Sequence, residues 1–135
     1  MDYGYTKKHK KQMSSKNGIQ RSFSYAIEGF QYVLKREPNF RIHIITAMVM
    51  CILSFFLNLS NVEWIILILT IGQVMILELV NTSIEAIVNH ISPEYSMNAK
   101  IAKDVAAAAV FAGSIIAILV GAFLFIPKII LYMYF

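Results

Sequence analysis

Apolar residues gather in three long runs along the chain, at about residues 40–59, 62–91 and 100–126. Each run is long enough for a helix that crosses the ~30 Å hydrocarbon core of a membrane, which takes ~20 residues. The middle run would form a helix of ~45 Å, so its last turns should project beyond the lipid. No segment has the alternating pattern of a strand. The pattern therefore predicts an all-α membrane protein with three transmembrane helices.

A fourth helix is predicted before these spans, at about residues 21–36. Its apolar residues recur at helical spacing on one stripe, which contains Phe23, Ile27, Phe30 and Leu34. Such an amphipathic helix is suited to lie in the membrane interface with its aromatic rings in the lipid. A helix that docks against the spans is the alternative. Glu37-Pro38 should end it, because the residue before a proline is driven out of the α region.

The composition agrees with a membrane protein, since 58% of the residues are hydrophobic, 15% are charged and the mean hydropathy is +0.62. A single cysteine, Cys51, excludes an internal disulfide and a cysteine-rich metal site. Residues 1–18 are polar and rich in lysine, so we expect a mobile tail that is attracted to anionic membrane lipids. Residues 19–135 would then form the membrane domain.

The positive charges predict the orientation in the membrane. Nine of the twelve Lys and Arg residues precede residue 42, and none lies between residues 58 and 63. The next gap between apolar runs holds Lys100 and Lys103. The positive-inside rule then predicts a cytoplasmic N-terminus, three crossings of the plasma membrane and an outer C-terminus. Because the basic tail adjoins membrane spans and lacks a folded module that reads bases, nucleic acid is not an expected partner.

Polar residues interrupt the second predicted span on one face, formed by Glu78, Asn81, Glu85 and Asn89 at positions i, i+3, i+7 and i+11. Ionisable groups at a membrane edge are costly, so this face should meet water, a ligand or another helix. A polar seam that only holds helices together is one alternative. The two carboxylates lie ~10 Å apart along the helix axis, a separation suited to two tasks around one elongated ligand.

Two further groups add to this face. Lys103-Asp104 opens the third span at the predicted cytoplasmic side, where a lysine can contact phosphate or merely extend to the interface. Glu37 lies at the corner before the first span. With Glu85 it could supply oxygen ligands to Mg²⁺, which binds through one or two carboxylates together with substrate phosphates. The phosphate-binding glycine motifs of P-loop, Rossmann and protein-kinase folds are absent from the sequence.

Taken together, these motifs resemble the small membrane kinases of the bacterial diacylglycerol kinase family. The resemblance rests on E-x-x-N-[ST]-x-I-E at residues 78–85, on K-D eighteen residues after its second glutamate, and on E-x-x-F-R at residues 37–41. It covers about residues 20–127. The short outer turn, the ISPEYS connection and the I-P-K ending are more similar to the undecaprenol kinases of the family than to its diacylglycerol kinases.

The resemblance implies ATP- and Mg²⁺-dependent phosphorylation of a lipid alcohol, with undecaprenol preferred over diacylglycerol, in a homotrimer that shares active sites between subunits. By position, Glu78 resembles the general base beside the acceptor hydroxyl. Glu37 and Glu85 resemble metal ligands. The implied nucleotide contacts comprise these two glutamates with Tyr25, Glu94, Tyr95, Ser96, Lys103 and Asp104. Asn81 would orient groups beside Glu78, and Arg21 and Arg41 would lie at the lipid entrance.

One position departs from the pattern, because the family usually has Asp where this chain has Asn89. Asn keeps an oxygen acceptor but carries no charge, so a second metal ion held there would bind less tightly. Two other classes of function stay open at this point: a small transporter whose Glu78 and Glu85 relay protons or cations, and an assembly protein without activity. A transporter favours carboxylates near the midplane, whereas this set extends to the cytoplasmic boundary.

Overall fold

The computed structural model describes residues 18–134 and contains four helices. They are α2 (Gly18–Arg36), α3 (Pro38–Phe56), α4 (Asn61–Ile91) and α5 (Met97–Tyr134). No strand occurs in these residues, and α3, α4 and α5 are each long and apolar enough to cross a membrane. The predicted all-helical class is therefore confirmed, and the three predicted spans correspond to three helices that are long and apolar enough to cross a membrane. Apart from Gly18, the predicted basic tail lies outside the described residues.

The chain divides into two compact units, residues 1–36 and residues 37–135. The first unit contains α2, which includes the helix predicted at residues 21–36. This helix ends at Arg36, and Glu37 takes an extended backbone with φ −100° and ψ 108°, as expected for a residue before proline. The location of α2 at a membrane surface stays a prediction.

The turn between α3 and α4 is set by a left-handed residue, Asn58, with φ 49°. Its N–H donates to the carbonyl of Phe55 at 3.3 Å, and the N–H of Leu59 donates to that of Ser54 at 3.2 Å. These are the two hydrogen bonds of a Schellman C-cap. The first span therefore ends at Phe56, three residues before the predicted boundary at residue 59.

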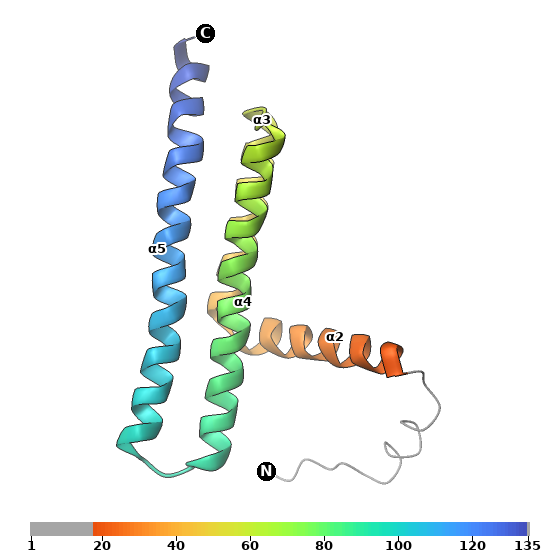
Figure 1. The fold of residues 1–135 in the computed structure, drawn as a ribbon, viewed down its shortest axis with the longest axis vertical. Coiled ribbons are helices and arrows are strands. Elements are labelled where there is room, and N and C mark those ends of the chain that lie inside the picture. Colours follow the sequence, from red (N-terminus) through yellow and green to blue (C-terminus); the bar gives the residue numbers. More distant parts are fainter. Residues whose placement is uncertain (1–17, 135) are drawn as a thin grey trace. The chain divides into compact units, whose positions relative to one another are not determined.

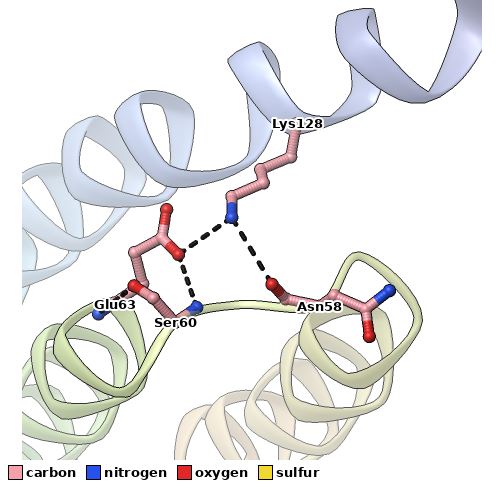
Figure 2. Close-up of polar contacts among 4 residues, drawn as sticks. All are labelled: Asn58, Ser60, Glu63 and Lys128. Carbon is pink, nitrogen blue, oxygen red and sulfur yellow. Dashed lines mark hydrogen bonds and ion pairs between the residues drawn. The ribbon is translucent and has the colours of Figure 1, made fainter.

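Helix α4 begins directly after this turn with a capping box. The Ser60 N–H donates to the Glu63 carboxylate at 2.6 Å, and the Glu63 N–H donates to the Ser60 hydroxyl at 3.4 Å. This pair satisfies two of the backbone donors that a helix N-terminus leaves free. Figure 2 shows that the same carboxylate reaches α5, where Lys128 Nζ lies 2.9 Å from Glu63 and 3.5 Å from the Asn58 carbonyl.

The predicted end of the third span at residue 126 is wrong, because α5 runs through Pro127 to Tyr134. A proline removes one backbone hydrogen bond from a helix, but it does not force the helix to stop when the flanking residues favour its continuation. Here the residues after Pro127 are mostly apolar, and Lys128 ties this part of α5 to the turn before α4. The helix also begins at Met97, three residues before the predicted start.

Helices α4 and α5 lie side by side in opposite directions and are joined by a short turn (Figure 1). Near the Lys128 end, α4 and α5 pack with the end of α3 around a core of Leu59, Leu67, Leu124 and Phe125. Further along, Gly113 of α5 allows close approach, since a Cβ there would lie 2.5 Å from Leu77 Cδ1. Many other apolar side chains point outward, as Phe123 does with 82% exposure, which suits contact with lipid.

The left-handed turn can be tested at Asn58. We expect Asn58→Val to destabilise the fold by about 1–2 kcal/mol, because a β-branched residue is strained at positive φ. Asn58→Gly should keep the stability, since glycine adopts this conformation without strain. Thermal unfolding in detergent micelles measures both variants. Equal unfolding temperatures for the valine and glycine variants would contradict the assigned turn.

Candidate active site

The predicted polar face of α4 changes from buried to exposed along the helix. Glu78 is 2% exposed and Asn81 is 9% exposed, whereas Glu85 is half-buried and Asn89 is exposed. Thr82, one turn after Glu78, is also buried. The face therefore begins inside the packed helices and opens toward the turn between α4 and α5. This gradient suits a site whose inner end is dry and whose outer end meets water.

Hydrogen bonds connect neighbouring members of this face. Thr82 Oγ1 donates to the Glu78 carbonyl at 3.0 Å, a bond within the helix. Asn81 Nδ2 donates to Glu85 Oε1 at 3.3 Å, so the amide joins the buried part of the face to its half-buried part. The other Asn81 atom, Oδ1, is buried without a hydrogen-bond partner among residues 18–134. Such an unpaired oxygen is costly, and it is positioned to accept a hydrogen bond from a ligand.

Glu78 and Asn81 line a cavity of about 270 Å³, which we name the seam pocket. Its other lining residues come from α3 and α5: Asn39, Ile42, His43, Ala107, Val110, Phe111 and Ser114. The surface of the pocket is therefore mainly apolar, although five of its nine lining residues are polar or ionisable. Cavities of this kind bind small molecules or the reactive ends of larger ones.

Three charged or titratable side chains act electrostatically on the Glu78 carboxylate: His43, Glu37 and Glu85. Glu37 and Glu85 are two of the predicted site residues, so the fold brings them near the predicted base. His43 was not predicted from the sequence as a member of this group. The available signal was its spacing from Asn39, because the two polar residues are one helical turn apart near the start of a largely apolar span.

A second cavity, the turn pocket, has a volume of about 380 Å³ and lies where α4 ends and α5 begins. It collects most of the predicted nucleotide-binding residues, and its polar lining comprises Asn89, Ser92, Glu94, Tyr95, Ser96, Lys100, Lys103 and Asp104. Lys103 Nζ donates to Asn89 Oδ1 at 3.2 Å and so joins α5 to α4. Lys100 forms an ion pair with Asp104, one turn further along α5. The pocket can therefore offer cationic and hydrogen-bonding groups to an anionic ligand.

The remaining predicted site residues lie outside both pockets. Arg41 is exposed on α3. Arg21 and Tyr25 lie on α2, in the first unit. Their roles toward a substrate stay predictions.

The carboxylates of the site can be compared with the ligands that a magnesium ion needs. Within residues 18–134, no three His, Cys, Asp or Glu side chains come together as a cage for a metal ion. Magnesium does not require such a cage, because it binds through one or two carboxylates, substrate phosphates and water. Glu37 and Glu85 both act on Glu78 and so provide two carboxylates in one region. The donor set therefore fits a magnesium ion that arrives with a phosphorylated ligand.

Comparison with known proteins adds a family assignment. Residues 24–125 match the family model described as prokaryotic diacylglycerol kinase. The undecaprenol kinase of Bacillus subtilis is 38% identical over 113 residues, which are 84% of this chain and 92% of that protein. A diacylglycerol kinase of Synechocystis is 40% identical over 110 residues, 81% of this chain and 63% of that protein. A diacylglycerol kinase of Haemophilus influenzae is 35% identical over 105 residues, 77% of this chain and 89% of that protein.

The unpaired oxygen of Asn81 has a consequence for stability. Replacing Asn81 with leucine removes a buried acceptor that has no hydrogen bond, and an unsatisfied group of this kind costs about 1–3 kcal/mol of stability. The same change loses the hydrogen bond from Asn81 to Glu85, which is worth about 1 kcal/mol. We therefore expect Asn81→Leu to keep or raise the unfolding temperature of the ligand-free protein in detergent. Thr82→Val serves as the neighbouring control. A large loss of stability in the leucine variant alone would mean that this oxygen is already satisfied.

Proposed function

Because the chain belongs to the prokaryotic diacylglycerol kinase family, we propose that it transfers the γ-phosphoryl group of ATP to a membrane lipid alcohol, with undecaprenol as the acceptor. The observation that carries this proposal is the buried Glu78 carboxylate, which lines an apolar pocket beside the unpaired oxygen of Asn81. A carboxylate in such a place is expensive unless it serves a ligand or a reaction.

In the proposed mechanism the hydroxyl end of the lipid enters the seam pocket. The apolar lining from Val110 and Phe111 holds the first carbons of the chain. Asn81 Oδ1 lies beside Glu78 and orients the groups near it. Glu78 acts as a general base and accepts the proton of the hydroxyl as the hydroxyl oxygen attacks the γ-phosphorus. The bond from this phosphorus to the bridging oxygen breaks at the same time, and ADP is the leaving group. The dry inner end of the face also limits transfer to water.

The nucleotide occupies the turn pocket in this proposal. The residues after α4, Glu94–Ser96, contact ATP, and Lys103 and Asp104 contact it from α5. Lys103 places a positive charge near the transferred phosphoryl group, whose negative charge must be balanced in the transition state. Glu37 and Glu85 would hold a magnesium ion, which would supply further neutralisation of the phosphate charge. Glu37, Glu85 and Asn81 thereby connect the two pockets.

The wider assembly is also part of the proposal. Residues 19–135 form the kinase domain, which works as a homotrimer in the plasma membrane with sites shared between subunits. The N-terminus and the active site face the cytoplasm, and the C-terminus lies outside. The α2 helix and the basic tail contact anionic lipids, Tyr25 contacts ATP, and Arg21 and Arg41 lie at the lipid entrance. The positive-inside pattern and the few residues outside lipid support this arrangement.

The choice of undecaprenol as the acceptor is supported by similarity to a named relative more than by the chemistry of the pocket. The relative named undecaprenol kinase is matched over 92% of its length, and the family also contains proteins named diacylglycerol kinase. Purified protein with labelled ATP and either undecaprenol or diacylglycerol tests this directly. We expect more label on undecaprenol. If most of the label appears on diacylglycerol, then diacylglycerol and not undecaprenol is the preferred acceptor. No label on either lipid would favour a transporter or an assembly protein.

Glu78→Gln tests the proposed base. It should lower turnover by roughly a hundredfold to ten-thousandfold, the usual contribution of a general base, because glutamine cannot accept the proton. The affinity for ATP, measured by equilibrium binding, should stay near that of the unaltered protein. Normal turnover in the glutamine variant would remove Glu78 from this role.

Glu85→Gln tests the proposed metal ligand. A neutral amide binds magnesium more weakly than a carboxylate, so the magnesium concentration for half-maximal transfer should rise several-fold. Glu28→Gln is the control, since Glu28 is an exposed glutamate of α2 with no role in the proposed metal site. If both variants need the same magnesium concentration as the unaltered protein, Glu85 is not a ligand.

A further inference from the structure

The three lysines of α5 have different partners. Lys100 forms an ion pair with Asp104, and Lys128 forms one with Glu63 at 2.9 Å (Figure 2). Lys103 instead donates to the side-chain amide oxygen of Asn89 at 3.2 Å. Within residues 18–134, no carboxylate lies within ion-pair distance of Lys103. Among the lysines of α5, Lys103 is therefore the one without a carboxylate partner in this part of the chain, and its acceptor is an uncharged amide oxygen.

This hydrogen bond lies at a wall of the turn pocket. Asn89 lines the pocket from the end of α4, and Lys103 lines it from the start of α5. Lys103 is half-buried, and its flexible side chain would sample many positions without an acceptor. An amide oxygen restricts the ammonium group without cancelling its charge, whereas a carboxylate would do both.

From this geometry we propose that Asn89 is a positioning residue for Lys103, which it holds at the turn pocket with its charge available to a nucleotide phosphate. The inference rests on the proposed function and deepens it at the nucleotide end of the site. It also differs from the sequence-based expectation for Asn89, in which the residue acts on a second metal ion. Asn89 acts here through Lys103 and does not contact the reacting atoms.

Asparagine and aspartate have nearly the same shape, so Asn89→Asp changes the charge of the acceptor and little else. The new carboxylate would form an ion pair with Lys103 and compete with the phosphate for it. We expect the KM for Mg-ATP to rise by roughly threefold to fivefold, the factor that corresponds to an exposed ion pair, with kcat changed less than KM. Steady-state kinetics with saturating lipid measures both constants.

Asn98→Asp is the matched control. Asn98 is exposed in the first turn of α5, close to the same end of the molecule, and it does not line the turn pocket. The Asn98→Asp substitution adds the same negative charge without offering Lys103 a new partner in the pocket. The KM for Mg-ATP should therefore change by less than in Asn89→Asp. Equal increases in the two variants would overturn the inference, because general repulsion of ATP would then explain both.

Two further outcomes separate the inference from its rivals. An unchanged or lower KM for ATP in Asn89→Asp, with half-maximal transfer at a lower magnesium concentration, would identify residue 89 as a metal ligand and overturn the positioning role. If the unaltered protein transfers no phosphate to lipid, the proposed function itself fails. Should the aspartate variant not fold, Asn89→Leu keeps the test open. That variant should lower kcat more than it raises KM, because Lys103 loses its acceptor but keeps its charge.

Discussion

The cost of placing ionisable groups among apolar helices governs this structure. Glu78 is almost fully buried in a helix that is otherwise apolar enough to span a membrane. Hydrocarbon offers such a carboxylate no hydrogen-bond partners, so it must face a pocket or another polar group. The structure gives it a pocket on one side and the polar face of α4 on the other. In the proposed mechanism, the gradual opening of this face toward the turn connects the buried place of the alcohol with the solvent-exposed place of the nucleotide.

Contacts at the opposite end of α4 and α5 fix how these two helices are aligned along each other, and the polar face requires this alignment. The Schellman turn at Asn58 and the capping box of Ser60 define where α4 starts, and Lys128 ties the same turn to α5. Two antiparallel helices joined at both ends have little freedom to slide along each other. The pairing of Asn89 with Lys103 at the far end is consistent with this fixed alignment. Contacts far from the proposed chemistry thus help to hold the site together.

Sequence patterns predicted the main elements because membrane helices follow simple rules of length and polarity. The spacing of Glu78 and Asn81 placed both on one face of a helix, and their burial agrees with the expectation that this face does not meet lipid. The end of the third span was missed because Pro127 normally indicates a stop, and the long-range tie by Lys128 is invisible in a local pattern. His43 was missed because its place beside Glu78 depends on how α3 packs against α4, which periodicity does not contain.

The central claim is that an alcohol meets the Glu78 carboxylate while the nucleotide lies at the turn between α4 and α5. The most direct measurement is a cryo-electron microscopy structure of the protein in a lipid nanodisc with a nonhydrolysable ATP analogue, magnesium and undecaprenol. We expect the lipid hydroxyl within hydrogen-bond distance of Glu78 and the terminal phosphate of the analogue between this hydroxyl and Lys103. A lipid hydroxyl bound away from Glu78, or an analogue bound outside the turn pocket, would contradict it.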